Sequence, residues 1–170
     1  EERLTTWFDT FMPTLELRND TVAELMSDSA LVWITEYDFD GFRHDATKHI
    51  PMNFTRLLTA KIRAASDDHV YQIGETYGSD ELIASYVGSG KVDAQFNFNL
   101  YDAAFEAFTQ EGATFDRLRK ALESSLTYYG HHHLMGNISG NQDKPRFSSM
   151  ASGHLSMSED SKLAGWTREI

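Results

Sequence analysis

Three carboxylates follow directly on segments with the pattern of β-strands: Asp45, Glu75 and Asp143. Asp45 and Glu75 are one strand–helix unit apart, so we expect them at the carboxyl ends of neighbouring parallel strands, facing the same edge of the sheet. Two carboxyl groups about 5–5.5 Å apart are what a retaining glycoside hydrolase needs, one to attack the anomeric carbon and one to protonate the leaving oxygen. Spacing alone leaves a binding module open, because an acid at a strand end is often only a cap or an ion-pair partner.

The sequence around each acid suggests different tasks. Arg43 lies two residues before Asp45, so on a strand both side chains project to the same side and the positive charge would keep Asp45 ionised. Glu75 follows the apolar Ile73 and Gly74 with no cation beside it in the sequence, a setting that would keep the carboxyl protonated. The simpler alternative is that Arg43 and Asp45 form an ion pair with a purely structural role.

Helical and strand periods alternate along the chain and must position these acids. Helices are predicted over 21–34, 54–65, 80–87, 100–108 and 115–126, and strands over 38–45, 70–75, 92–96 and 134–139. Residues 140–146 and 148–156 are expected to form loops, and a last helix is expected from Ser158 to Ile170.

The helices carry specific expectations about their ends and faces. Thr21 and Glu24 have the spacing of a capping box for the first helix. Its apolar face is expected to comprise Val22, Leu25, Met26, Ala30 and Trp33, with Leu31 and Trp33 in the core. The helix over 115–126 is expected to pack through Leu118, Leu122 and Leu126, and Phe96–Asn99 to form packing plus a turn.

Strand–helix alternation with short connections predicts an α/β fold, a parallel sheet covered by helices. A doubly wound sheet is the alternative to a barrel, but neither GxGxxG nor GxxxxGK[ST] is present. Polar residues at the ends of successive strands favour a (β/α)8 TIM barrel, in which catalytic groups occupy that face. Such barrels take roughly 250 residues, so four strands make only part of one.

The composition excludes several classes of protein. The 170 residues carry a formal net charge of −11, which disfavours nucleic acid and anionic membranes as partners. Without cysteine there is no disulfide, zinc–thiolate site or cysteine nucleophile. No apolar run approaches the ~20 residues of a transmembrane segment, and no signal-peptide pattern is visible in residues 1–170, which open on Glu1-Glu2-Arg3 as a mature or trimmed N-terminus would. Consecutive residues of an extended segment point to opposite faces, so His131, His132 and His133 do not predict a metal site.

Four segments resemble those of one enzyme family. Gly41–His49 (GFRHDATKH), Ile73–Glu75 (IGE) and Gly140–Arg146 (GNQDKPR) resemble the second, third and fourth signatures of the α-amylase superfamily, glycoside hydrolase family 13. Lys91–Phe98 (KVDAQFNF) resembles the sixth barrel strand of amylase and cyclomaltodextrinase-like members. The resemblance extends over essentially the whole chain and implies that residues 1–170 form one partial catalytic domain, roughly barrel strands four to seven.

The resemblance also implies roles for individual residues. Asp45 is expected to be the nucleophile, Glu75 the general acid and base, and Asp143 the carboxylate that stabilises the transition state. Arg43 is expected to orient the nucleophile, while Lys48 and His49 match a pair that holds the leaving side of the glucan in α-amylases. Asn141 and Gln142 are expected to contact substrate. Tyr77, just after Glu75, could stack on a sugar face, or it could simply be a packed loop residue.

Two departures from the family pattern matter. Gln142 stands where the fourth signature usually has His; its amide can donate a hydrogen bond but cannot become cationic. The first signature, strands one to three and eight, the inserted domain and the C-terminal sheet domain have no counterpart here. A structural calcium, to which the carbonyl of His49 would contribute, is therefore expected only in the full-length enzyme, and the isolated chain is expected to be inactive.

The resemblance implies hydrolysis of α-1,4 bonds in starch-type α-glucans or maltooligosaccharides, and no cofactor. One alternative is a cyclomaltodextrinase, neopullulanase or transglycosylase of the same family. Another is a non-catalytic glucan-binding relative, but the presence of all three carboxylates argues against it. Polymeric substrate predicts an exported, periplasmic or extracellular protein. Nothing in the sequence addresses the oligomeric state.

Overall fold

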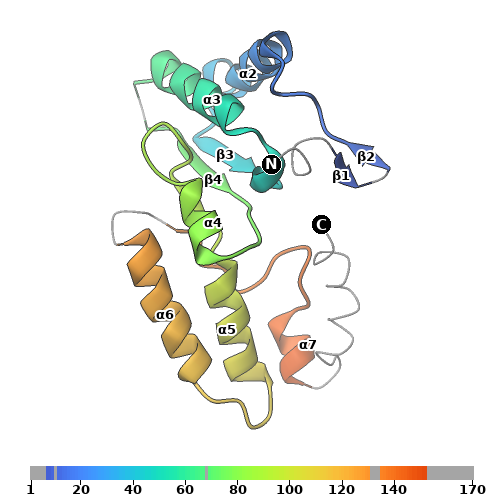
Figure 1. Ribbon diagram of the computed structural model, residues 1–170, viewed down its shortest axis with the longest axis vertical. Coiled ribbons are helices and arrows are strands. Elements are labelled where there is room, and N and C mark those ends of the chain that lie inside the picture. The colour runs from blue at the N-terminus through green and yellow to red at the C-terminus, as the bar shows by residue number, and fades with distance from the viewer. Residues whose placement is uncertain (1–6, 10, 68, 131–134, 153–170) are drawn as a thin grey trace. The chain divides into compact units, whose positions relative to one another are not determined.

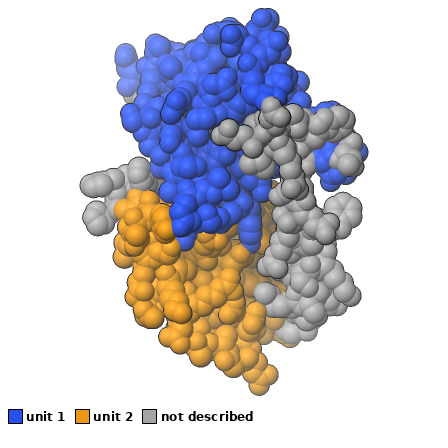
Figure 2. Space-filling view, viewed as in Figure 1, with its two compact units in different colours: residues 1–96, 131–136 blue, residues 97–130, 137–170 orange. Residues whose placement is uncertain are grey.

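The computed structural model describes residues 7–9, 11–67, 69–130 and 135–152. They fall into two compact units, coloured separately in Figure 2. Unit 1 comprises Glu1–Phe96 and His131–Gly136, and unit 2 comprises Asn97–Gly130 and Asn137–Ile170. The expected helix from Ser158 to Ile170 lies outside the described residues.

Unit 1 is built on a parallel sheet of order β3-β4-β5 (Figure 1). The strands are β3 (Gly41–His44), β4 (Tyr71–Gly74) and β5 (Ala94–Gln95). The helices are α2 (Asp20–Thr35), α3 (Met52–Ala65), α4 (Asp80–Ser85) and the short 3-10 helix η1 (Thr47–His49). A small antiparallel pair, β1 (Trp7–Asp9) and β2 (Met12–Pro13), precedes them and had no counterpart in the sequence analysis. Strand β3 is followed by α3 and then by the parallel strand β4, which confirms the expected βα arrangement.

Helix α2 begins two residues earlier than the capping box predicts, with its N-cap at residue 19 instead of 21. Asn19 is its N-cap, with extended backbone angles, and its Oδ1 accepts from Thr21 N at 3.0 Å and Val22 N at 3.3 Å. The Thr21–Glu24 capping box is therefore wrong, because a better acceptor at Asn19 satisfies the first free N–H groups of the helix.

The buried face of α2 is only in part the predicted one: Val22 and Ala30 are half-buried, and Ala30 packs against the core. Ala23, Ser27 and Ile34 are buried, whereas Leu25 and Trp33 are 66% and 47% exposed. The small side chains of Ala23 and Ser27 let α3 lie close alongside α2 (Figure 1). Trp33 instead contacts two other exposed rings, Tyr37 and Phe39, each with centroids 5.3 Å away. Leu31 is partly buried against the core, as expected.

The core of unit 1 lies among α2, α3 and the sheet. Its buried residues are Ala23, Ile34, Phe54, Leu58, Ile62 and Val70. Along one edge of the helix pair, Lys61 Nζ of α3 lies 2.5 Å from both Glu24 Oε2 and Asp28 Oδ1 of α2. Apolar packing and these ion pairs fix α3, the helix that connects the two strands bearing the acids.

The strand predicted over 134–139 does not form as a strand in the part of the chain that is described. Residue 134 lies outside it, and Gly136 makes only an isolated parallel bridge with Phe96, donating its N–H to Gln95 O at 3.0 Å. A Cβ at Gly136 would lie 2.5 Å from Ile73 Cδ1, so glycine permits this close approach. One residue further along, the contact is between side chains: Asn137 Oδ1 accepts from Asn97 Nδ2 at 3.3 Å.

Unit 2 contains α5 (Phe98–Thr109), α6 (Asp116–Tyr129) and α7 (Phe147–Ala151). Helix α5 begins at Phe98, where a turn was predicted, because Asn97 caps it by accepting from Leu100 N. Helix α7 occupies residues 148–151 of the loop expected over 148–156, and the residues from 153 onward lie outside the described chain. Tyr101, Phe105 and Met150 form the core of this unit.

Helix α6 again buries a different face from the predicted leucine stripe. Leu118 is half-buried, but Leu122 and Leu126 are 47% and 65% exposed. Its buried side faces α5, where Ser125 Oγ accepts from Asn97 Nδ2 at 2.9 Å. Among the described helices of both units, none has the length and apolar character needed to cross a bilayer.

Candidate active site

The register of the sheet brings Asp45 and Glu75 to equivalent positions on neighbouring strands. His44 pairs with Gly74 at the last position of the β3–β4 ladder, so Asp45 and Glu75 each follow one residue beyond. Glu75 N donates to His44 O at 2.9 Å, which continues the ladder past the strand ends. The predicted placement of these two acids on adjacent parallel strands is confirmed.

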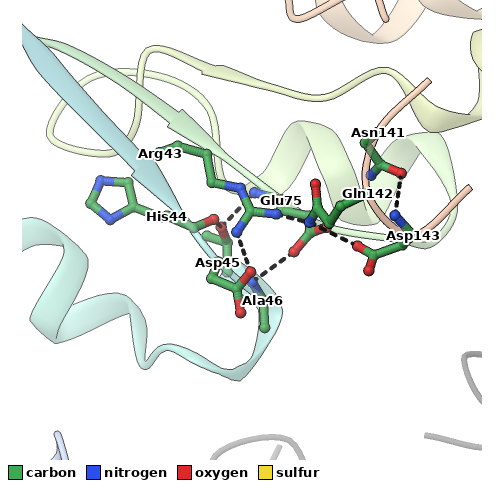
Figure 3. Close-up of polar contacts among 9 residues, drawn as sticks. Arg43, His44, Asp45, Ala46, Glu75, Asn141, Gln142 and Asp143 are labelled. Carbon is green, nitrogen blue, oxygen red and sulfur yellow. Dashed lines mark hydrogen bonds and ion pairs between the residues drawn. The ribbon is translucent and has the colours of Figure 1, made fainter. Parts of the chain in front are cut away.

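One guanidinium group contacts both acids (Figure 3). Arg43 Nη1 donates to Asp45 Oδ1, and Arg43 Nη2 lies 3.0 Å from Glu75 Oε1. The contact with Asp45 follows the prediction from their spacing. Glu75 has no cation beside it in the sequence, but the neighbouring strand supplies Arg43 across the ladder, so the cation-free setting expected for Glu75 is wrong.

The two carboxyl groups differ strongly in exposure. The Asp45 side chain is 74% exposed and the Glu75 side chain 17% exposed. Glu75 Oε2 also accepts from Ala46 N at 3.1 Å. Ala46 presents this N–H from a left-handed conformation, φ 45°, which is strained for a residue with a Cβ. The more buried acid is thus held on both oxygens, and the other is open at the surface of unit 1.

Lys48, His49 and Tyr77 gather around the same strand ends. Lys48 Nζ donates to Tyr77 O at 3.5 Å, and Tyr86 Oη donates to Lys48 O at 3.3 Å. Burial lowers the pKa of Lys48, while the nearby Glu75 carboxylate raises it by a smaller amount. His49 is buried and Tyr77 half-buried. Their contacts with a substrate stay predictions.

The third predicted acid lies in unit 2, in a loop with its signature neighbours. Asp143 N donates to Asn141 Oδ1 at 3.0 Å, and Gln142 Nε2 donates to Asp143 Oδ2 at 3.0 Å (Figure 3). The Gln142 amide thus donates to the neighbouring carboxylate, and the hydrogen bond to a sugar hydroxyl that the sequence allows stays a prediction. That Asp143 acts together with Asp45 and Glu75 stays a prediction from the resemblance.

Sequence reasoning missed a buried polar network behind the acids. His44 Nε2 lies 3.1 Å from Gln72 Oε1, and Gln72 Nε2 donates to Thr59 Oγ1 at 3.1 Å. Burial lowers the pKa of His44, an effect that the hydrogen bond to Gln72 only partly offsets. Thr47, also missed, is 1% exposed and bonds to both strand ends. The sequence held a signal for this network, because the polar residues His44 and Gln72 alternate with Arg43 and Ile73 along the strands.

A metal site does not assemble from the residues that the structure describes. No group of three or more His, Asp or Glu side chains among them could hold a metal ion. His131, His132 and His133 lie outside the described residues. The backbone carbonyl of His49 by itself does not make a calcium site, so these residues do not fit the expected ion without further ligands.

Fold and site together define part of a parallel β/α barrel with paired carboxylates at its strand ends. The family model described as "Alpha amylase, catalytic domain" matches residues 3–166. The chain therefore belongs to the alpha-amylase family, and it is part of that family's catalytic TIM barrel.

Individual relatives agree with this assignment. The chain is 29% identical over 155 residues to a cyclomaltodextrinase of Geobacillus thermopakistaniensis, covering 87% of this chain and 26% of that protein. It is 30% identical over 135 residues to alpha-amylase 2 of Schizosaccharomyces pombe, covering 79% and 22%. The alpha-amylase of Geobacillus thermoleovorans, solved in complex with acarbose, matches with TM-score 0.80 and 27% identity over 89% of this chain and 34% of that one. The chain thus spans about a quarter of the length of these curated relatives.

Proposed function

We propose that the full-length protein containing this chain is a retaining glycoside hydrolase that cleaves α-1,4-glucosidic bonds of starch-type α-glucans or maltooligosaccharides. The observation that carries the proposal is the single Arg43 guanidinium in contact with two acids at equivalent positions on adjacent strands. Neighbouring strands lie about 4.8 Å apart, and retaining glycosidases hold their carboxyl groups about 5–5.5 Å apart. This placement, with one guanidinium reaching both carboxyl groups, suits the short separation that double displacement needs.

In the first step, the Asp45 carboxylate attacks the anomeric carbon, and the bond from that carbon to the leaving oxygen breaks. Glu75 gives its proton to the leaving oxygen and becomes a carboxylate. In the second step, Glu75 takes a proton from water, whose oxygen attacks the anomeric carbon and releases Asp45. Two inversions return the original α configuration.

The exposures support this division of roles. A nucleophile must reach the sugar ring in its charged form, and Asp45 is open to solvent with Arg43 beside it. Glu75 is the more buried of the two and is held on both oxygens, by Arg43 and by the Ala46 N–H, as suits a donor that must be aimed at one atom. Asp143 is proposed to stabilise the oxocarbenium-like transition state, with Asn141 and Gln142 holding it and the sugar hydroxyls.

The test uses a blocked aryl maltooligosaccharide with the full-length protein, its Glu75→Gln variant and a Glu111→Gln control. Glu111 is an exposed acid between α5 and α6, so its loss should leave the rate unchanged. Glu75→Gln removes the proton donor and should lower kcat about 100- to 10,000-fold. The first product detected by NMR should be the α anomer. A parent protein that binds the glucan without cleaving it, or that releases the β anomer first, would refute the proposal.

A cyclomaltodextrinase is the second candidate, because relatives named cyclomaltodextrinase and alpha-amylase match at nearly the same identity. The Lys48–His49 pair favours the amylase. Rates on a cyclomaltodextrin and on a linear maltooligosaccharide of equal length separate the two. Export of the protein is proposed only from the substrate class.

A further inference from the structure

Thr47 joins the ends of the two strands that carry the acids. Its Oγ1 accepts from Glu75 N at 2.8 Å and donates to His44 O at 3.0 Å. Its own N–H donates to Glu75 O at 2.7 Å. Both backbone polar groups of Glu75 are therefore bonded to Thr47, and the Glu75 N–H is shared with His44 O at 2.9 Å. Thr47 is 1% exposed and cannot touch a substrate.

The surroundings of Thr47 leave its hydroxyl little freedom. A Cβ built on Gly74 would lie 2.6 Å from Thr47 Oγ1 and 2.3 Å from Gln95 Nε2, so both side chains occupy the space that glycine leaves open. Gln95 is completely buried. Because these groups are packed without room to move, the Thr47 hydroxyl is held between the two strand ends.

Thr47 also fixes the neighbour that binds the Glu75 carboxyl group. Ala46 precedes it in the chain and donates to Glu75 Oε2 at 3.1 Å from a left-handed conformation. If Thr47 moves, the N–H of Ala46 moves with it. The main chain and the side chain of Glu75 thus depend on the same short segment.

We propose that Thr47 is a positioning residue for Glu75: its hydroxyl and N–H fix the backbone of the proton donor and so aim its carboxyl group at the leaving oxygen. This inference rests on the proposed function. It predicts that loss of the Thr47 hydroxyl harms reactions that need proton donation and spares those that do not, since proton transfer requires a donor within about 2.6–3.2 Å of the acceptor atom.

The experiment compares two substrates of the full-length protein that differ in their leaving group. With a maltooligosaccharide the leaving group is a sugar alkoxide, which needs the proton of Glu75. With α-maltosyl fluoride the leaving group is fluoride, which needs no proton, and added azide attacks the glycosyl-enzyme in place of water, so neither step on the fluoride needs Glu75. Thr47→Val should lower kcat on the maltooligosaccharide about 10- to 100-fold, in the range that a misplacement of ~1 Å costs, with less than about 3-fold loss on the fluoride. Thr47→Ser keeps the hydroxyl and should restore the rate to within about 3-fold of the wild type.

Two reference variants complete the design. Glu75→Gln should show the same selective loss in more extreme form, because it removes the proton itself. Thr127→Val removes a hydroxyl from α6, where Thr127 Oγ1 donates only to Glu123 O, and should leave both rates unchanged. If Thr47→Val does not fold, Thr47→Ala also lacks the hydroxyl and takes its place.

The outcomes separate the two proposals. Equal loss on both substrates, no loss on either, or failure of Thr47→Ser to restore the rate would overturn the positioning role while leaving the glycosidase reading intact. A wild-type protein that turns over neither substrate, or a Glu75→Gln variant as active as the wild type, would refute the proposed function and the role of Thr47 with it.

Discussion

Gly74 has no room for even a single added methyl group. It is the last residue of β4, directly before Glu75. An alanine Cβ there would lie 2.3 Å from Gln95 Nε2 and 2.6 Å from Thr47 Oγ1. Favourable contacts between heavy atoms lie near 3.5–4.0 Å, so each neighbour must retreat by roughly 1 Å.

Neither neighbour of Gly74 can retreat freely. Gln95 is 0% exposed and Thr47 1% exposed, and the hydroxyl of Thr47 is bonded to both strand ends. Overpacking a closed interior costs about 1–3 kcal/mol. Because two fully buried side chains must shift together, we expect Gly74→Ala to lower the free energy of unfolding by about 2–3 kcal/mol.

Urea denaturation of the full-length protein, followed by circular dichroism, measures this loss. Gly78→Ala is the matched control: its nearest neighbour is Leu82 Cδ2 at 2.7 Å, the tip of a half-buried side chain that can rotate away. We expect the control to cost less than about 1 kcal/mol. If Gly74→Ala unfolds within about 0.5 kcal/mol of the wild type, the close packing of Thr47 and Gln95 over Gly74 is wrong.

Three further predictions concern other contacts. Arg43→Met leaves the two acids without their shared cation and should lower kcat/KM on a maltooligosaccharide at least about 100-fold, about 2.7 kcal/mol of transition-state stabilisation; a loss below 5-fold would contradict its role at both carboxylates. Asn19→Ala removes the observed cap of α2 and should cost about 1 kcal/mol in urea denaturation, whereas Thr21→Ala should stay within about 0.5 kcal/mol; the reverse order would restore the capping box. Burial lowers the pKa of His44 below its ordinary 6.5, so the unfolded chain binds a proton at His44 more readily than the folded one. The stability that the neutral, buried His44 contributes is therefore complete above pH 6.5 and declines as the pH falls toward the folded pKa. His44→Gln keeps a hydrogen-bond donor that does not titrate, and the pH dependence of its unfolding free energy below pH 6.5 should be shallower than that of the wild type; identical slopes would refute the assignment.

Local sequence was sufficient for the elements that bear the acids. Apolar segments separated by helical patterns predicted β3, α3 and β4, and polar residues at their ends predicted where Asp45 and Glu75 would lie. These features depend on the period of side chains along a strand or helix and on the parallel connection through α3, both of which are properties of short stretches of chain.

The faces of the helices could not be predicted in the same way. Helix α2 has apolar residues on more than one side, so its period did not decide which side is buried. Packing favoured the side with Ala23 and Ser27, whose small side chains let α3 come close, over the side with Leu25 and Trp33. The strand predicted over 134–139 was wrong for a related reason. A segment with β-propensity becomes a strand only where a neighbouring strand continues the hydrogen-bond ladder, and here only Gly136 makes a bridge.

The sequence by itself determined the candidate acids, Asp45 and Glu75, the strand ends that carry them, and the family to which the chain belongs. Tertiary structure decided how those acids are held: the second contact of Arg43, the bonds of Thr47 to both strand ends and the space that Gly74 leaves for Gln95. Each of these depends on the register between strands far apart in the chain. A shift of one residue would turn every side chain to the other face, and only the packed sheet selects the register.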